Sequence, residues 1–325
     1  MKTLRDTIYQ ITLPTPYAVG DVHCYLLKGE KLTLVDTGVK TEEAWNGLKK
    51  QLSDLGYLPK DIEQIIYTHH HPDHMGLLEP FENVSMVAAH EKLKPWLERD
   101  EDFFQRYEWF YQEMYEEAGV PASYFKLLKS LRKPLKWTAR GELTQVLSEG
   151  DLLPGHEEWI TIETPGHAQS HLSFFRNSDG ALLGGDHLLP HISSNPLLEP
   201  PYIPGEARPA PLLQYRDSMI KLRDYPIGTV YPGHGKIFED VQPLITRRLE
   251  RQEERAQKVK DMIGVGKATI YQVCQQLFPK QIETQFGLTM SETVGQLDYL
   301  EASGQVDYVM EGKRKYYYVN KGGWK

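Results

Sequence analysis

The seven residues Thr68-His69-His70-His71-Pro72-Asp73-His74 constrain this chain more than any other segment. They follow an apolar run, residues 62–67, that predicts a buried strand. Four of their side chains are of types that bind zinc and similar divalent cations: His69, His71, Asp73 and His74. A solvated polar loop is the alternative interpretation, but so dense a group of ligand types after a strand favours a metal centre.

The spacing indicates two adjacent metal positions. Residues two apart on extended backbone point to the same side, so His69 and His71 can bind one ion together. Pro72 predicts a bend, after which we expect a helix that directs Asp73 and His74 to a second position.

Further ligands are expected from three downstream segments that each end a predicted strand: Thr164-Pro165-Gly166-His167, Gly184-Gly185-Asp186-His187 and Tyr231-Pro232-Gly233-His234. Together with the histidine-rich segment they resemble the ligand set of the metallo-β-lactamase-fold hydrolases over residues 5–240. Seven positions agree in type and order, which makes the resemblance specific. It implies an α/β fold, an αββα sandwich.

The resemblance also implies a role for each ligand. The first metal is held by His69, His71 and His167, the second by Asp73, His74 and His234, and Asp186 bridges them. Two metals so placed activate a bridging hydroxide, with Asp73 and Asp186 as the catalytic carboxylates and Asp73 passing a proton to the leaving group. Zinc is the default for these ligands, although iron or manganese suit similar sites.

Several other side chains are candidates for contact with the ligands. Asp36, in Leu34-Val35-Asp36-Thr37-Gly38, matches the acidic residue of the family behind the metal-binding loop, although a turn-forming Asp is the alternative without the resemblance. Support of the ligands or contact with the substrate, against a purely structural role, is left open for three histidines: His171, His187 and His191. The remaining histidines are interpreted as structural, packing or surface residues: His23, His70, His90 and His156.

Composition narrows the location and the partners. The formal net charge of −8 opposes broad attraction to nucleic acid or acidic membranes. No apolar run is long enough to span a bilayer and residues 1–6 lack the core of a signal peptide, so we expect a cytoplasmic protein without membrane contact. Only Cys24 and Cys274 are present, which argues against a disulfide framework and against thiolate ligands.

Pattern changes along the chain predict three regions. Residues 1–240 form the catalytic domain, interrupted at 90–137 by a helical insertion, and 241–263 form a charge-laced connecting helix. The insertion carries aromatic residues at helical spacing, such as Phe103, Tyr107 and Tyr111. Such a stripe is usually packing core, but here it is also a candidate wall or lid of the substrate cleft.

Residues 264–325 predict a winged-helix-like domain, with helices at 269–277 and 291–303 and a hairpin of strands 306–310 and 315–319. Seven basic residues face six acidic ones from residue 265 onward, which is too even for a surface that tracks phosphates. We therefore expect a packing role or a homodimer contact, and only the tip Lys313-Arg314-Lys315 argues for RNA or DNA.

These features favour a dinuclear hydrolase of a small-molecule ester, thioester or lactone. A phosphodiesterase or single-stranded ribonuclease is the second hypothesis. The third, from another class, is a nucleic-acid-binding regulator whose metal site senses a ligand.

Overall fold

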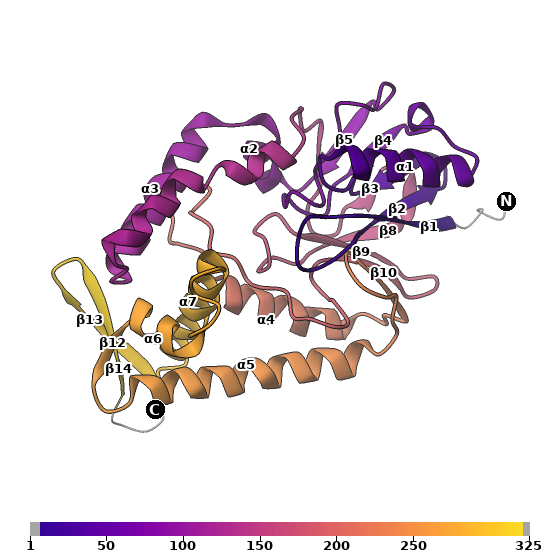
Figure 1. Cartoon of the computed structure of the whole chain (residues 1–325). Coiled ribbons are helices and arrows are strands. Elements are labelled where there is room, and N and C mark those ends of the chain that lie inside the picture. The colour runs from indigo at the N-terminus through magenta and orange to yellow at the C-terminus, as the bar shows by residue number, and fades with distance from the viewer. Residues whose placement is uncertain (1–6, 321–325) are drawn as a thin grey trace. The chain divides into compact units, whose positions relative to one another are not determined.

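A six-stranded mixed sheet contains the N-terminal strands of the chain (Figure 1). In spatial order its strands are β1 (Thr7–Leu13), β2 (Val22–Lys28), β3 (Leu32–Val35), β4 (Gln64–Ile66), β5 (Met86–Ala89) and β6 (Gln145–Val146). The first three are antiparallel, whereas β3 to β6 run parallel. Alternating apolar runs near 7–13, 22–28 and 32–35 predict strands in the sequence, and the structure confirms them with the same bounds.

A five-stranded sheet supplies the second half. Its spatial order is β11 (Thr229–Pro232), β10 (Ala181–Gly185), β9 (Leu172–Arg176), β8 (His156–Glu163) and β7 (Leu152–Leu153). Buried side chains of both sheets share one apolar cluster, in which Val35 and Ile66 of the first sheet join Trp159 and Phe174 of the second. The two sheets therefore face each other, as in the predicted sandwich.

Helix α1 (Glu42–Asp54) covers the other face of the first sheet. Its apolar residues at helical spacing, Ala44, Leu48 and Leu52, are buried in the cluster that contains β1 and β4 side chains. The sequence predicts a helix over 41–55 with Thr41 as its N-cap, and in the structure the Thr41 hydroxyl accepts a hydrogen bond from the Ala44 amide.

The prediction of a helix after Pro72 is wrong, because the chain makes only a single turn there. The amides of His74 and Met75 both donate to the His71 carbonyl, but the next amides do not continue the pattern. Gly76 donates to the Gly38 carbonyl and Leu77 to the Thr37 hydroxyl, so the loop after β3 takes the donors that a helix would need.

The structure, a computed structural model, describes residues 7–320, and contacts divide them into two units. Lys321 and Lys325, counted above in the charge balance, lie outside the described residues. The first unit holds both large sheets and comprises the described residues up to Asp100, Lys133–Ser194 and Ser218–Val241. The second comprises Glu101–Arg132, Asn195–Asp217 and the described residues from Gln242 on. The insertion thus groups with the C-terminal region by contacts, although the two are far apart in sequence.

The second unit is mainly helical. It contains α3 (Glu101–Glu117), α6 (Ile270–Leu277), α7 (Phe286–Ala302) and a small sheet of β12 (Lys267–Thr269), β14 (Arg314–Val319) and β13 (Val306–Glu311). Strand β12 was not predicted, and α7 begins five residues before the predicted start at 291. Tyr111, Met114 and Tyr115 of α3 are buried in one cluster with α6 and α7 residues, so the aromatic stripe of the insertion is packing core.

The remaining elements are short or cross between the units. Helices α4 (Pro211–Lys221) and α5 (Val241–Ile263) each contribute residues to both units. The short ones are α2 (Lys94–Glu98), η1 (Pro59–Asp61), η2 (Glu91–Leu93), η3 (Ala122–Ser130), η4 (Lys133–Trp137) and η5 (Leu222–Asp224). Within residues 7–320, none of the helices is long and apolar enough to cross a membrane.

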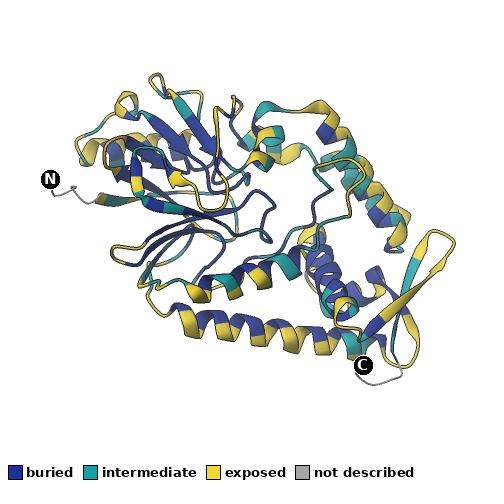
Figure 2. Ribbon diagram, turned by 180° about the vertical axis from the view of Figure 1, so that it is seen from behind, coloured by how far each residue is buried: buried dark blue, intermediate teal, exposed yellow. Residues whose placement is uncertain are grey.

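Helix α7 is the centre of the second unit. Twelve of its 17 residues are buried, including polar ones on several sides, and the helix is dark blue over most of its surface in Figure 2. Its buried charges are paired: Glu292 accepts from Arg255 at 2.6 Å and Asp298 accepts from Arg208 at 2.6 Å. A helix buried in this way has little surface left for a partner molecule.

Candidate metal centre

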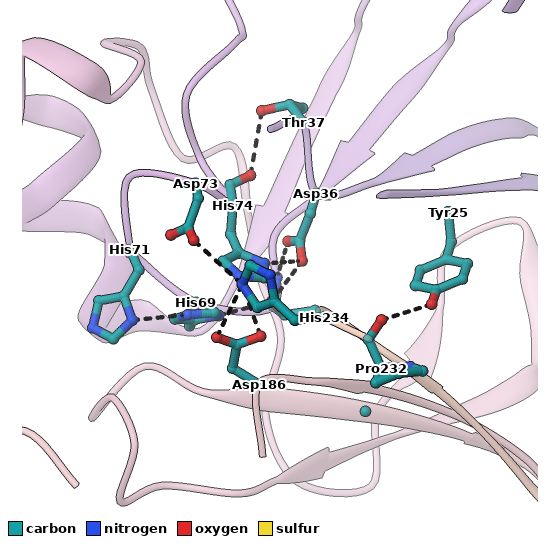
Figure 3. Close-up of polar contacts among 12 residues, drawn as sticks. Tyr25, Asp36, Thr37, His69, His71, Asp73, His74, Asp186, Pro232 and His234 are labelled. Atoms are coloured by element: carbon teal, nitrogen blue, oxygen red, sulfur yellow. Dashed lines mark hydrogen bonds and ion pairs between the residues drawn. The ribbon is translucent and has the colours of Figure 1, made fainter. Parts of the chain in front are cut away.

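The ends of β4, β8, β10 and β11 bring all seven predicted ligands together, and Figure 3 labels six of them, all except His167. The side chains form three overlapping groups, and within each group the donor atoms all lie within 4.8 Å of one another. These groups are His69, His71 and His167; His69, His74 and Asp186; and Asp73, His74 and His234. The first and third groups match the two predicted metal positions in composition.

Asp186 stands between these two groups. Its Oδ1 is 3.3 Å from His74 Nε2, while its Oδ2 is 3.6 Å from both His167 Nε2 and His234 Nε2. Asp73 Oδ2 lies 3.3 Å from His234 Nε2. One carboxylate thus reaches imidazoles of both groups, as a bridging ligand must.

The donor set fits divalent cations. His74 Nε2, His234 Nε2 and Asp186 Oδ1 are buried and have no hydrogen-bond partner among the described residues, which is costly unless a cation binds them. The Gly233 backbone is so close that an added Cβ would lie 2.2 Å from Asp186 Oδ1. The glycines on both sides of His234 predict that the backbone can approach the site closely, and the distance at Gly233 agrees with that prediction.

The pKa values of the imidazoles are shifted in opposite directions by their surroundings. Burial, with a contribution from neighbouring imidazoles, holds the pKa values of His69 and His71 well below the ordinary value, so both rings are neutral and keep a lone pair for a metal. Burial opposes protonation of His74 too, but Asp186 and Asp36 outweigh it and raise the pKa of His74 well above the ordinary value. The same negative charge favours a bound cation.

Asp36 holds the histidine loop from behind. Its carboxylate accepts three hydrogen bonds of 2.8 Å each, from the Thr68 amide, the Thr68 hydroxyl and His74 Nδ1. It is 2% exposed, and its φ of +59° is a left-handed conformation that Asp tolerates better than most residues. This arrangement orients His74 so that Nε2 faces Asp186.

His171 supports the bridging carboxylate in a similar way. Its Nε2 accepts from the Asp186 amide at 3.0 Å and its Nδ1 lies 2.8 Å from the Thr164 hydroxyl. The backbone carbonyl of Asp186 also accepts from the Ser194 hydroxyl. His171 therefore contacts a candidate ligand, which is one of the alternatives that the sequence left open.

The other histidines are distributed more widely. His187 is fully buried, and burial together with His167 lowers its pKa to about 3. His70 stacks on Trp96 at 4.2 Å and its Nδ1 lies 2.8 Å from the Ser170 hydroxyl, which confirms its structural role. His191 is exposed and lies against Gly235, beside the ligand His234.

His23 is the contact that the sequence interpretation missed. It was assigned to packing, but its ring and its amide hold the loop that carries His234. No local signal reveals this, because the residues that meet are more than 200 positions apart.

Two facing mixed sheets with His and Asp groups gathered at the ends of their strands define a metal-dependent hydrolase. A sequence profile of the "Metallo-beta-lactamase superfamily" matches residues 17–234. The chain belongs to this superfamily.

One relative in sequence and two solved structures are similar to this chain over nearly its whole length. The "Probable metallo-hydrolase YqjP" of Bacillus subtilis (strain 168) is 41% identical over 319 residues, which cover 98% of this chain and 99% of the relative. A metallo-beta-lactamase family protein from Thermus thermophilus superposes with a TM-score of 0.80 at 27% identity, covering 96% of this chain and 98% of that one. A beta-lactamase domain protein from Burkholderia ambifaria shares the fold with a TM-score of 0.77 at 21% identity, over 98% and 96% of the two chains.

Proposed function

We propose that this chain is a dinuclear metallohydrolase of small esters, thioesters or lactones. The observation that carries the proposal is the pair of donor groups that share Asp186. His69, His71 and His167 would hold one cation and Asp73, His74 and His234 the other. Zinc suits this nitrogen and carboxylate set, as do iron and manganese.

The bound cations would supply an activated water and polarise the oxygen of the substrate. The chain contributes the rest of the site. Asp186 would set the separation of the two positions, while Asp36 and His171 fix the rotation of His74 and the backbone of Asp186. Asp73 is 7% exposed and sits at the edge of the ligand set, where its carboxylate could hand a proton to a leaving group.

The burial of α7 and the pairing of the basic hairpin tip in the C-terminal region favour a carbonyl substrate over nucleic acid. We infer a winged-helix-like domain there, from α6, α7 and the hairpin β13–β14, but twelve of the 17 residues of α7 are buried, which leaves little free surface. At the hairpin tip, Lys313 pairs with Glu116 at 2.5 Å, and Lys315 lies 3.7 Å from the Tyr308 ring centroid and 5.1 Å from that of Tyr317. The basic tip, the main argument for a nucleic-acid-binding regulator, is thus partly engaged within the protein.

A distant relative supports thioesters among the candidate substrates. The "Atrochrysone carboxyl ACP thioesterase" of Aspergillus fumigatus is 23% identical over 174 residues, about half of this chain. The phosphodiesterase or ribonuclease alternative has no comparable support.

An activity panel on metal-quantified protein tests the proposal. The panel contains p-nitrophenyl esters, thioesters, lactones, bis-p-nitrophenyl phosphate and short RNA. We expect turnover of at least one carbonyl substrate that scales with bound metal, and none of RNA. Turnover of RNA alone, or DNA binding in a filter assay with a steep loss of affinity at rising salt, would contradict it.

A further inference from the structure

Residues at the beginning of β2 form hydrogen bonds with the loop that carries the proposed ligand His234. The His23 amide donates to the Gly233 carbonyl at 2.7 Å, and His234 Nδ1 donates to the Asp21 carbonyl at 2.7 Å. The Tyr25 hydroxyl donates to the Pro232 carbonyl at 2.7 Å, which Figure 3 shows as a dashed line. Residues 21–25 thus contact each of the residues 232–234 in turn.

The His23 side chain adds a further hydrogen bond to this loop, at Gly235. Its Nε2 is 2.6 Å from the Gly235 carbonyl oxygen, which can only accept, so Nε2 must carry the ring proton. Nδ1 is then an acceptor, and it lies 3.0 Å from the Thr12 hydroxyl and 3.1 Å from Gln10 Nε2, both of which can donate. The ring is 7% exposed and satisfied at both nitrogens. One tautomer and one orientation are therefore selected.

The Gly235 carbonyl needs such an anchor. Gly235 directly follows His234 and has a φ of +83°, a conformation that few residues other than glycine adopt readily. The Gly235 carbonyl belongs to the peptide that joins Gly235 to Lys236, so without this donor the chain directly after His234 loses a hydrogen bond that helps to fix its conformation. A metal ligand that is misplaced by about 0.5 Å already loses much of its binding geometry.

The other ligands near the second position do not depend on β2. His74 is oriented by Asp36, and Asp186 by His171 and Ser194. At the first position, His69 Nδ1 lies 2.9 Å from the Thr68 hydroxyl. His234 is thus the one predicted ligand for which the described hydrogen bonds come from the β1–β2 end.

We propose that His23 is a positioning residue that keeps His234 in its ligating conformation, so that the affinity of the second metal position depends on His23 while that of the first does not. The proposal rests on the two-metal arrangement proposed above. It goes beyond that arrangement by assigning the affinity of one position to a side chain outside the ligand set.

Zinc titration of chelator-stripped full-length protein tests it, with bound zinc counted by mass spectrometry at buffered free zinc. His23→Ala removes the donor, whereas His23→Gln keeps an amide donor of similar reach. His156→Gln is the matched control, because His156 of β8 is also buried and its Nε2 lies 2.6 Å from the Thr33 hydroxyl of β3.

We expect His23→Ala to bind the second zinc about 10- to 100-fold more weakly than the natural protein, with the first equivalent unchanged. His23→Gln should recover part of this loss, and His156→Gln should match the natural protein. If His23→Ala does not fold, as judged by circular dichroism, His23→Gln is compared with His156→Gln in the same titration.

Two results would overturn the proposal. One is binding of both equivalents by the His23 variants as tightly as by the natural protein, and the other is an equal loss of both equivalents. These outcomes are separate from those of the substrate panel, because zinc is counted without any turnover. A natural protein that binds only one zinc would instead refute the dinuclear arrangement itself.

Discussion

Asp73 lies where a metal ligand can also carry a proton. Asp73→Asn keeps an oxygen for the cation but removes the carboxylate that accepts and returns a proton. We expect kcat on a competent ester or thioester to fall about 100-fold or more, while bound metal falls less than twofold. Metal content and kcat are measured on the same preparation. Asp186→Asn is the comparison, since it should lower metal content directly, and equal losses in Asp73→Asn would contradict the proton-transfer role.

Asp36 gives a second prediction at this scale. In Asp36→Asn the negative charge is lost and an NH2 group replaces one acceptor oxygen. It meets the Thr68 amide if it takes the place of Oδ1, and both the Thr68 hydroxyl and His74 Nδ1 if it takes the place of Oδ2, so buried hydrogen bonds are lost or weakened. We expect about 1–3 kcal/mol less stability of the metal-free protein in urea denaturation. Asp36→Ala should cost more, because it removes all three bonds and places alanine at a φ of +59°. Equal stability of the natural protein and Asp36→Asn would show that the bonds are replaced by water.

His90 predicts a pH effect. Burial lowers its pKa against the opposing effect of Glu163, and its Nδ1 accepts from the Lys92 amide at 3.0 Å, so the ring is neutral in the folded protein. The unfolded chain takes up the proton near pH 6.5, so the contribution of His90 is complete above that pH and is lost as the pH falls below it. The effect is at most about 1.4 kcal/mol per pH unit.

The measurement is urea denaturation of metal-free natural protein and His90→Gln at pH 7.5 and 5.5. We expect the stability advantage of the natural protein to shrink at the lower pH. A constant difference between the two proteins would mean that the pKa of His90 is the same in the folded and unfolded chains.

Individual ligands were predictable because their types cluster in sequence, but their supports were only partly so. Asp36 and His171 stand near the ligands along the chain or match the superfamily pattern. His23 does neither, and its function arises from the pairing of Val22 with His234, a contact between distant segments.

At the scale of elements, the burial of α7 makes it sensitive to substitution. A Cβ added at Gly295 would lie 2.8 Å from the Leu212 side chain, which is itself buried. Gly295→Ala must therefore displace packed neighbours, and we expect it to lower stability by about 1–3 kcal/mol despite the better helix propensity of alanine.

Gly287 in the same helix is the control, because an added Cβ there meets no atom within 4 Å. Gly287→Ala should be neutral or slightly stabilising, by up to about 1 kcal/mol. Thermal denaturation of both variants provides the comparison. A stabilised Gly295→Ala would show that Leu212 moves without cost.

Helices and strands were predicted correctly where the residues of the segment alone determine its structure. The prediction failed where a distant segment accepts the backbone hydrogen bonds. The capped helix 41–55 and the first three strands follow from spacing and turns. The histidine segment remained a turn because Gly38 and Thr37 take its amides, and such competition is not visible in the segment itself.

At the scale of the whole molecule, removal of metal should act on the first unit. Chelation removes a stabilisation of about 2.7 kcal/mol for a metal that was present at 100 times its Kd. We expect faster hydrogen exchange in peptides covering 68–76, 184–190 and 230–236, with α7 peptides unchanged. Addition of zinc should restore protection, and loss of protection in α7 would show that the second unit depends on the metals too.

The grouping of chain segments was the least predictable feature. Linear boundaries at 90, 137, 241 and 264 followed changes of pattern, whereas contacts join the insertion to the C-terminal region. The aromatic stripe of α3 reveals its amphipathic character but not which distant helices it meets.

The second unit is assembled from three stretches that are separated by parts of the first. All three stretches are therefore needed to form it. A chain truncated before α5 would expose the aromatic side chains of α3 to solvent, and such a protein would be prone to self-association. Grafting this region onto another hydrolase would require three simultaneous transplants rather than a single C-terminal fusion.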